Sequence, residues 1–263
     1  MTLSSFPQRA PFLKRETVRQ IAVLRVIRSL KGGAQNLNLS LTAEQLVSFG
    51  TYFSALREAG VRSGVISARD RERIVSRHFL ESLAFGSELA QAGLLSGRVI
   101  DVGSGGGLPG LSLRIAWPQI EMTLLEASAK KAAFLEILLA DLSLPLCEVA
   151  VGRAEDVGRD SRYRETYHLA VARAVAPLRV LLELALPFVE VNGYLAALKG
   201  SRAAAEIDAA GPALAELQAS VEDVRSLPKS AGVSMSVVVI RKKAATPDRF
   251  PRRAGIPAKR PLR

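Results

Sequence analysis

Residues 101–107 read Asp-Val-Gly-Ser-Gly-Gly-Gly and stand between a short β-rich run and a helical one. Glycine has no side chain, so such a loop can adopt positive φ and lets a ligand approach the backbone closely. The helix that follows is expected to present free N–H groups at its start, which favour an electronegative group such as a carboxylate. The next β-rich run ends at Glu126, whose carboxylate can accept hydrogen bonds from a ribose diol. Together these features predict a site for an adenosine-containing cofactor.

The glycine pattern alone leaves NAD open as an alternative. Gly105-x-Gly107-x-x-Gly110 matches the dinucleotide-binding pattern in a shifted register, but Pro109 lacks the N–H that a pyrophosphate would need there. In the register that starts at Gly103, the third glycine position is Leu108. A P-loop is excluded because no Gly-Lys-Ser/Thr follows the loop.

From Arg98 onward, short β-rich runs alternate with helical ones, which predicts a parallel sheet with crossover helices. Strands are expected at residues 99–102, 122–125, 148–151, 169–172 and 194–198, with a final antiparallel pair at 221–227 and 235–240. Helices are expected at residues 109–117, 128–142, 177–185 and 202–218. The predicted fold is therefore α/β, with a seven-stranded, mostly parallel, Rossmann-like sheet.

The N-terminal part is expected to be helical. Thr42 and Gln45 have the spacing of a capping box. One helical face then carries Leu46, Phe49, Phe53 and Leu56. Two further helices are expected, over residues 17–31 and 69–92, the second ending near Gly93.

Four parts are expected along the chain. These are a basic arm and short helix at 1–38, a helical layer at 39–97, the cofactor-binding domain at 98–243 and an extended basic tail at 244–263.

The net charge of +11 is concentrated at the two ends of the chain, with +8 in residues 241–263 and +6 in residues 1–31. Clustered Lys and Arg displace counterions from phosphates, so this distribution favours a nucleic-acid partner, although charged tails also serve solubility alone. A single cysteine, Cys147, excludes an internal disulfide and a zinc site of paired cysteines. Because the chain has no disulfide, we expect a reducing, cytoplasmic compartment. Apolar runs are broken by charge, so no membrane span is expected.

The run Val-Ile-Asp-Val-Gly-Ser-Gly-Gly-Gly-Leu-Pro-Gly at residues 99–110 resembles the cofactor loop of the RsmG family, also called GidB. Similar elements follow at Leu124-Leu125-Glu126, Lys130-Lys131-x-x-Phe134-Leu135, Gly152-Arg153-Ala154-Glu155, Ala172-Arg173-Ala174 and Ala197-Leu198-Lys199-Gly200. Residues 77–83 and the basic segment 250–262 also resemble the family, so the resemblance covers residues 39–262. The chain departs from the family at residues 62–67, where Trp and an Asn-Leu-Thr run are usual, and at Glu81, which replaces Asp.

The resemblance implies a class I methyltransferase fold with a helical N-terminal extension and S-adenosylmethionine as cofactor. It implies that the methyl acceptor is N7 of a guanine in the 530 loop of 16S ribosomal RNA, presented as free RNA or in a small-subunit particle. Carried over position by position, the residues implied to line the cofactor site are Gly103, Leu108, Ala154, Glu155 and Arg173. Gly105 and Glu126 are added from the loop and diol arguments above. No metal is expected.

The residues that other methyl acceptors require are missing. Carbon-5 methylation of pyrimidines needs a cysteine nucleophile, but Cys147 sits beside a strand start, where it is expected to be a small core residue. Methylation of exocyclic amines usually uses an Asp/Asn-Pro-Pro-aromatic turn after the fourth strand, and residues 172–175 here read Ala-Arg-Ala-Val. Guanine N7 has an in-plane lone pair and no proton, so its methylation requires mainly alignment and desolvation. No catalytic acid or base is therefore named.

Two alternatives stay open at this point: a non-catalytic RNA-binding protein that kept the fold, and a small-molecule methyltransferase. The intact loop at 103–107 and Glu126 argue against the first, and the basic tail argues against the second, because a small-molecule enzyme has no evident use for it. Its residues expected to contact phosphate are Arg252, Arg253, Lys259 and Arg260. Cofactor binding is expected to persist without this tail.

Overall fold

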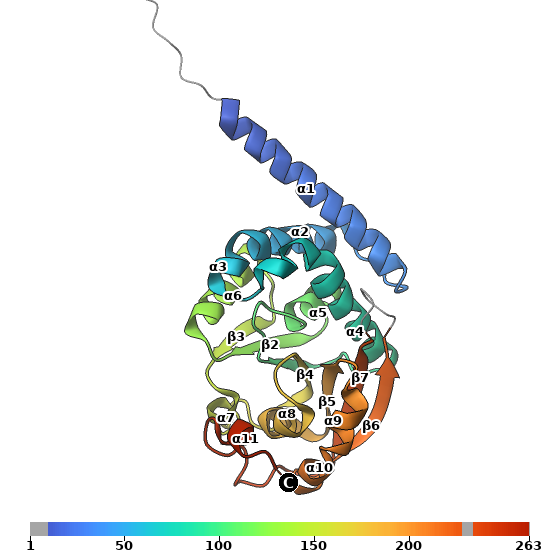
Figure 1. The fold of residues 1–263 in the computed structure, drawn as a ribbon, viewed down its shortest axis with the longest axis vertical. Helices are drawn as coiled ribbons and strands as arrows, with labels where there is room; N and C mark the ends of the chain where they lie inside the picture. Colours follow the sequence, from blue (N-terminus) through green and yellow to red (C-terminus); the bar gives the residue numbers. More distant parts are fainter. Residues whose placement is uncertain (1–9, 228–233, 263) are drawn as a thin grey trace, which may run out of the picture.

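The computed structural model describes residues 10–227 and 234–262, which form a three-layer α/β/α structure with a long helix projecting from it (Figure 1). The described strands are β1 (Arg98–Val102), β2 (Glu121–Glu126), β3 (Cys147–Val151), β4 (Tyr167–Arg173), β5 (Val189–Lys199), β6 (Ala219–Ser226) and β7 (Ser236–Lys242). They make one sheet in the order β3-β2-β1-β4-β5-β7-β6. Strands β1 to β5 pair in parallel, whereas β7 is antiparallel to both β5 and β6. The predicted class I methyltransferase fold is confirmed.

Both faces of the sheet are buried, as expected for a parallel sheet covered by crossover helices. Along β1, Val99 packs into one core and Ile100 into the other, since successive side chains point to opposite faces. The first core lies under the N-terminal helices, α5 and α6, and the second under α8 to α10. By the same alternation Asp101 points toward the first core, and so do Glu126 and Arg173.

The helices that cross over the sheet are α5 (Gly110–Ala116), α6 (Ala129–Leu142), α7 (Ala154–Val157) and α8 (Leu178–Ala185), the last continuing into the 3-10 turn η4 (Leu186–Phe188). The helix predicted at 202–218 is two short helices, α9 (Ala203–Asp208) and α10 (Gly211–Glu216). The break lies at Ala209-Ala210, because Pro212 in the first turn of α10 lacks the N–H that a continuous helix would donate to Asp208.

The N-terminal layer consists of α2 (Ala43–Ala55), the π-helical turn η1 (Leu56–Gly60), α3 (Val61–Ser63) and α4 (Leu80–Gln91). The capping box is present: the Gln45 N–H donates to the Thr42 hydroxyl and the Thr42 N–H to Gln45 Oε1. The single helix predicted at 69–92 is a 3-10 turn, η2 (Ala68–Arg73), then a π-helical turn, η3 (Ile74–Phe79), and then α4.

Helix α1 (Ala10–Gln35) is longer than the predicted helix at 17–31, and its first half extends beyond the body (Figure 1). Part of the predicted arm, residues 1–9, lies outside the described residues. No helix in the described part of the chain is long and apolar enough to cross a bilayer.

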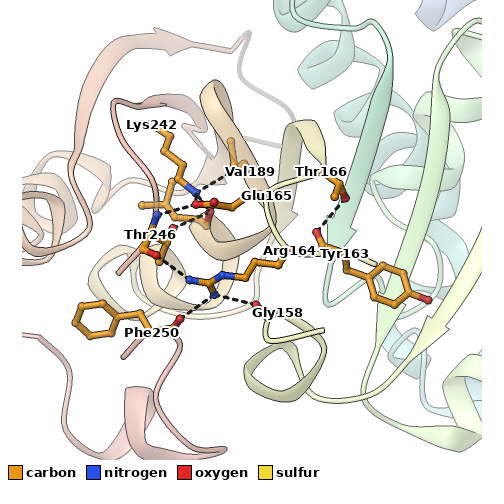
Figure 2. A network of polar contacts seen from close by, with 10 residues as sticks. Gly158, Tyr163, Arg164, Glu165, Thr166, Val189, Lys242, Thr246 and Phe250 are labelled. Carbon is orange, nitrogen blue, oxygen red and sulfur yellow. Dashed lines mark hydrogen bonds and ion pairs between the residues drawn. The ribbon is translucent and has the colours of Figure 1, made fainter. Parts of the chain in front are cut away.

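Residues 244–262, here called the C-terminal segment, pack onto the body, although the sequence predicted an extended tail. Phe250 is 2% exposed and lies in the second core, and α11 (Ile256–Lys259) forms a helical turn. Figure 2 shows the polar network at its start, where Lys242 Nζ donates to Glu165 Oε1 at 2.6 Å and to the Val189 carbonyl at 2.7 Å. The basic composition of the segment suggested a free tail. The segment is instead held against the body by the buried Phe250 and by the ion pair of Arg252 with Glu183.

Candidate cofactor site

The seven candidate residues lie at or just after the carboxyl ends of the neighbouring strands β1 to β4, which together form one edge of the sheet. Gly103, Gly105 and Leu108 lie between β1 and α5; Glu126 ends β2; Ala154 and Glu155 begin α7 after β3; and Arg173 ends β4. Ligands of open α/β sheets bind at this edge. Strand pairing therefore brings together residues from four separate parts of the chain.

The glycine loop is held by backbone hydrogen bonds and by the N-terminal layer. The N–H groups of Gly103 and Ser104 both donate to the Leu125 carbonyl, at 2.9 and 3.0 Å. The hydroxyl of the fully buried Tyr52 donates to the Gly106 carbonyl at 2.6 Å. Gly105 has a φ of +58°, and a Cβ placed on it would meet no heavy atom within 4 Å. The loop is thus held by Leu125 and Tyr52, whereas the position of a Cβ at Gly105 is open.

Glu126 is an acidic group beside that opening. Its Oε2 accepts from the Gly105 N–H at 2.9 Å and its Oε1 from the Ser128 N–H at 2.8 Å. The residue is 7% exposed. Each carboxylate oxygen has two acceptor sites, so these bonds leave capacity for hydroxyl donors.

Asp101 and Gly110 join β1 to α5. Asp101 is fully buried, and its Oδ2 accepts from the Gly110 N–H at 2.9 Å. A Cβ on Gly110 would lie 2.7 Å from Asp101 Cβ, so glycine allows the helix this close approach. The Leu111 N–H donates to the Gly107 carbonyl at 2.8 Å. The first two N–H groups of α5 are therefore bonded within the chain and are not free for a ligand, contrary to the expectation from sequence.

Burial raises the pKa of Asp101 from 3.8 to about 7, against the opposing effect of the Gly110 hydrogen bond. The folded state then holds a proton between about pH 4 and pH 7 that the unfolded state releases. The stability that this proton contributes is present below about pH 4 and is lost as the pH rises through about 7.

Asp101→Asn removes this titration and keeps an oxygen for the Gly110 N–H. We expect the free energy of unfolding of the native protein to fall by a few kcal/mol relative to the variant between pH 4 and 7. Urea denaturation of both proteins across that range measures the difference. Parallel pH profiles would show that Asp101 does not titrate there.

Helix α7 presents Ala154 and Glu155 beside the end of β2, since the Gly152 N–H donates to the Glu126 carbonyl at 3.0 Å. The first N–H groups of a helix have no acceptor within it, so the first turn of α7 can offer donors to a ligand. The Glu155 carboxylate is already engaged, because its Oε1 accepts from the Gly255 N–H of the C-terminal segment at 2.8 Å.

Arg173 is surrounded by residues of the N-terminal layer. Its Nη2 donates to His78 Nδ1 at 3.0 Å, its Nη1 to the Arg77 carbonyl at 3.2 Å, and Nη1 lies 3.6 Å from Glu81 Oε2. Burial, with a smaller effect of Arg173, lowers the pKa of His78 to about 4, so this imidazole is neutral at pH 7. The neutral ring accepts from the guanidinium at Nδ1 and keeps its proton on the buried Nε2. His78 and Glu81 thus orient Arg173.

A hollow of about 320 Å³ lies next to Arg173, beyond the ends of β4 and β5. Lys199 forms part of its wall, donating to the Ala176 carbonyl at 2.7 Å and lying 2.9 Å from Glu206 Oε2. Burial opposes ionisation of Glu206, but hydrogen bonds from Lys199 and the Leu178 N–H outweigh it and lower its pKa. Glu206 is therefore a paired anion, unsuited to accept a proton at neutral pH.

Sequence reasoning missed Tyr52 and the partners of Arg173. Tyr52 falls on the same helical face as Phe49 and Leu56, and a buried tyrosine hydroxyl needs a partner, so a signal was present. The pairing of Arg173 with His78 spans 95 residues and carries no local signal.

A family model described as "GidB: rRNA small subunit methyltransferase G" matches residues 45–233. The ribosomal RNA small subunit methyltransferase G of Roseiflexus castenholzii is 41% identical over 230 residues, or 87% of this chain and 97% of that protein. The protein of the same name from Alkaliphilus oremlandii is 39% identical, over 89% of this chain and 98% of its own length. Among solved structures, the branched-chain polyamine synthase of Thermus thermophilus shares the fold, with a TM-score of 0.50, 15% identity, and coverage of 63% of this chain and 56% of that chain. The match to the family model and to nearly the full length of these relatives shows that the chain belongs to the rRNA small subunit methyltransferase G family, GidB.

Proposed function

We propose that this protein transfers the methyl group of S-adenosylmethionine to N7 of a guanine in the 530 loop of 16S ribosomal RNA. The observation that carries the proposal is the open face of Gly105 with the Glu126 carboxylate held against it, in a chain of this family. An adenosine fits there with its ribose diol at Glu126 and its adenine ring toward the first turn of α7.

The residues around this site fit S-adenosylmethionine, which supplies a methyl group on a sulfonium centre that is activated for transfer. Gly105 leaves room for close approach, Gly103 has a φ of +78° and lies against Val175, and Leu108, 6% exposed, closes the loop onto the first core. Arg173 stands between the loop and the hollow of about 320 Å³, into which we place the acceptor guanine.

The chemistry demanded of this chain is alignment, because guanine N7 reacts through a lone pair and has no proton to lose. Among the titratable groups that line the hollow, Arg173, Lys199 and Arg202 are cations and Glu206 is a paired anion. The rigid ion pairs of Arg173 with Glu81 and of Lys199 with Glu206 hold the walls on either side of the base. No general base is assigned.

The exposed basic residues suit a ribosomal RNA partner, in free RNA or in a small-subunit particle within the cytoplasm. Arg253, Lys259 and Arg260 of the C-terminal segment are exposed, whereas Arg252 is committed to Glu183. Binding through phosphates predicts an affinity that falls steeply with salt.

A methyl-transfer assay with two transcripts of small-subunit RNA tests the acceptor atom. We expect labelled methyl to enter a transcript with ordinary guanosine and not one in which 7-deazaguanosine replaces it, because that base has carbon at position 7. A transcript lacking the 530 loop is the matched control and should also stay unlabelled. Equal labelling of the ordinary and 7-deaza transcripts would overturn the assignment to N7.

A further inference from the structure

We propose that the C-terminal segment positions the cofactor site by holding α7 at both of its ends. The inference rests on the proposed function, in which the first turn of α7 faces the adenine ring. A four-residue helix has too few internal hydrogen bonds to fix its own position, so α7 depends on what surrounds it.

The start of α7 is held through Glu155. This side chain is buried, with the residue 7% exposed, and its Oε1 accepts from the Gly255 N–H at 2.8 Å. Gly255 has a φ of +80°, in the left-handed region that glycine favours, which turns the chain into α11. The carboxylate of Glu155, a candidate cofactor-site residue, thus binds the backbone of the C-terminal segment.

The end of α7 is held by two arginines. Arg164 Nη1 donates to the carbonyls of Gly158, at 3.1 Å, and Phe250, at 2.9 Å, while its Nη2 donates to the Thr246 carbonyl at 2.7 Å. Figure 2 shows this guanidinium between the residue that follows α7 and the C-terminal segment. Arg159 Nη2 donates to the Pro251 carbonyl at 2.6 Å.

The C-terminal segment is itself anchored to α8, so it can act as a rigid support. Glu183 of α8 is fully buried and accepts from Arg252 three times, from its backbone N–H at 2.9 Å, its Nε at 2.8 Å and its Nη2 at 2.6 Å. The support therefore runs from the second core through Arg252 and Gly255 to Glu155.

Coupling of this kind is reciprocal. If the docked C-terminal segment raises the affinity for the cofactor, then bound cofactor must stabilise the docked segment by the same factor. A segment that served stability alone would not respond to the cofactor.

The first measurement uses the full native chain and S-adenosylhomocysteine as the probe. Hydrogen exchange should slow on binding in residues 154–158 and, together with them, in residues 250–259. Slowing at α7 with no change in residues 250–259 would overturn the proposal.

The second measurement compares cofactor affinities of point variants by calorimetry, well below their unfolding temperatures. Glu155→Ala should weaken binding of S-adenosylhomocysteine by about tenfold or more, the size expected when a hydrogen bond to a charged group is removed. Glu155→Gln keeps an oxygen for Gly255 and should lose less. Asp156→Ala is the matched control, because Asp156 is the exposed carboxylate of the same helical turn, and it should change affinity by less than about threefold.

Equal affinities of Glu155→Ala and Asp156→Ala would also overturn the proposal. Failure of the native protein to bind S-adenosylhomocysteine at all would instead refute the proposed function. The two failures are therefore distinguishable.

Discussion

Replacing Gly105 by valine will abolish binding of S-adenosylmethionine and leave the fold intact. A Cβ at this position faces open space, with no heavy atom of the chain within 4 Å. The valine side chain occupies the space beside Glu126 where we place the cofactor. We expect affinity to fall by at least about a hundredfold, or roughly 3 kcal/mol. The φ of +58° adds a strain of about 1–2 kcal/mol to the folded state.

Gly97→Val is the matched control for that strain. Gly97 has a φ of +61°, its Cβ also meets no heavy atom within 4 Å, and it precedes β1 at the opposite edge of the sheet. Both variants should lose a similar amount of stability in thermal unfolding, and only Gly105→Val should lose binding in calorimetry. Retained affinity in Gly105→Val would contradict the placement of the cofactor on this loop.

Deleting residues 244–263 will prevent stable folding. The deletion exposes the second core where Phe250 packs, and removal of a buried phenylalanine side chain costs about 3–5 kcal/mol. It also leaves the fully buried Glu183 without Arg252, and breaking a buried ion pair costs about 3–5 kcal/mol. Together these losses match the 5–15 kcal/mol by which proteins are usually stable. Soluble yield and circular dichroism of the truncated chain measure the effect.

The sequence alone predicts a different result, in which loss of residues 244–263 weakens RNA binding and leaves cofactor binding unchanged. A test of RNA contact therefore needs point variants, and Arg253→Ala combined with Lys259→Ala changes two exposed residues. This double variant should fold, bind cofactor normally, and bind RNA with a weaker salt dependence, by about one unit of slope for each phosphate that is no longer neutralised. A truncated chain that unfolds cooperatively and binds cofactor with native affinity would contradict the packing role of the segment.

The strands of the sheet were predictable because the residue patterns that mark them lie within short stretches of the chain. Strands buried on both faces are short apolar runs, and Gly93 and Pro177 mark helix ends in the chain itself. The breaks that were missed have other causes. Pro212 ends a continuous helical pattern at Ala209-Ala210, and at Arg73 a 3-10 turn gives way to the π-helical turn that carries His78, the partner of Arg173.

The proximity of Gly105 and Glu126 was predictable, because a residue type and its place at the end of a strand suffice for it. It was not predictable where a contact joins distant parts of the chain. Glu155 matched the family pattern, but its bond to Gly255 spans 100 residues and changes what the carboxylate does. The C-terminal segment was predicted to be extended for the same reason. Its basic composition indicates an anionic partner, but it does not show that Arg252 pairs with Glu183 or that Phe250 packs in the second core.

Mapping 7-methylguanosine in small-subunit ribosomal RNA, from cells with and without this protein, tests the central claim most directly. The proposed function predicts that one 7-methylguanosine in the 530 loop disappears with the protein, returns with the native chain, and does not return with Gly105→Val. An unchanged set of 7-methylguanosines in cells that lack the protein would contradict it.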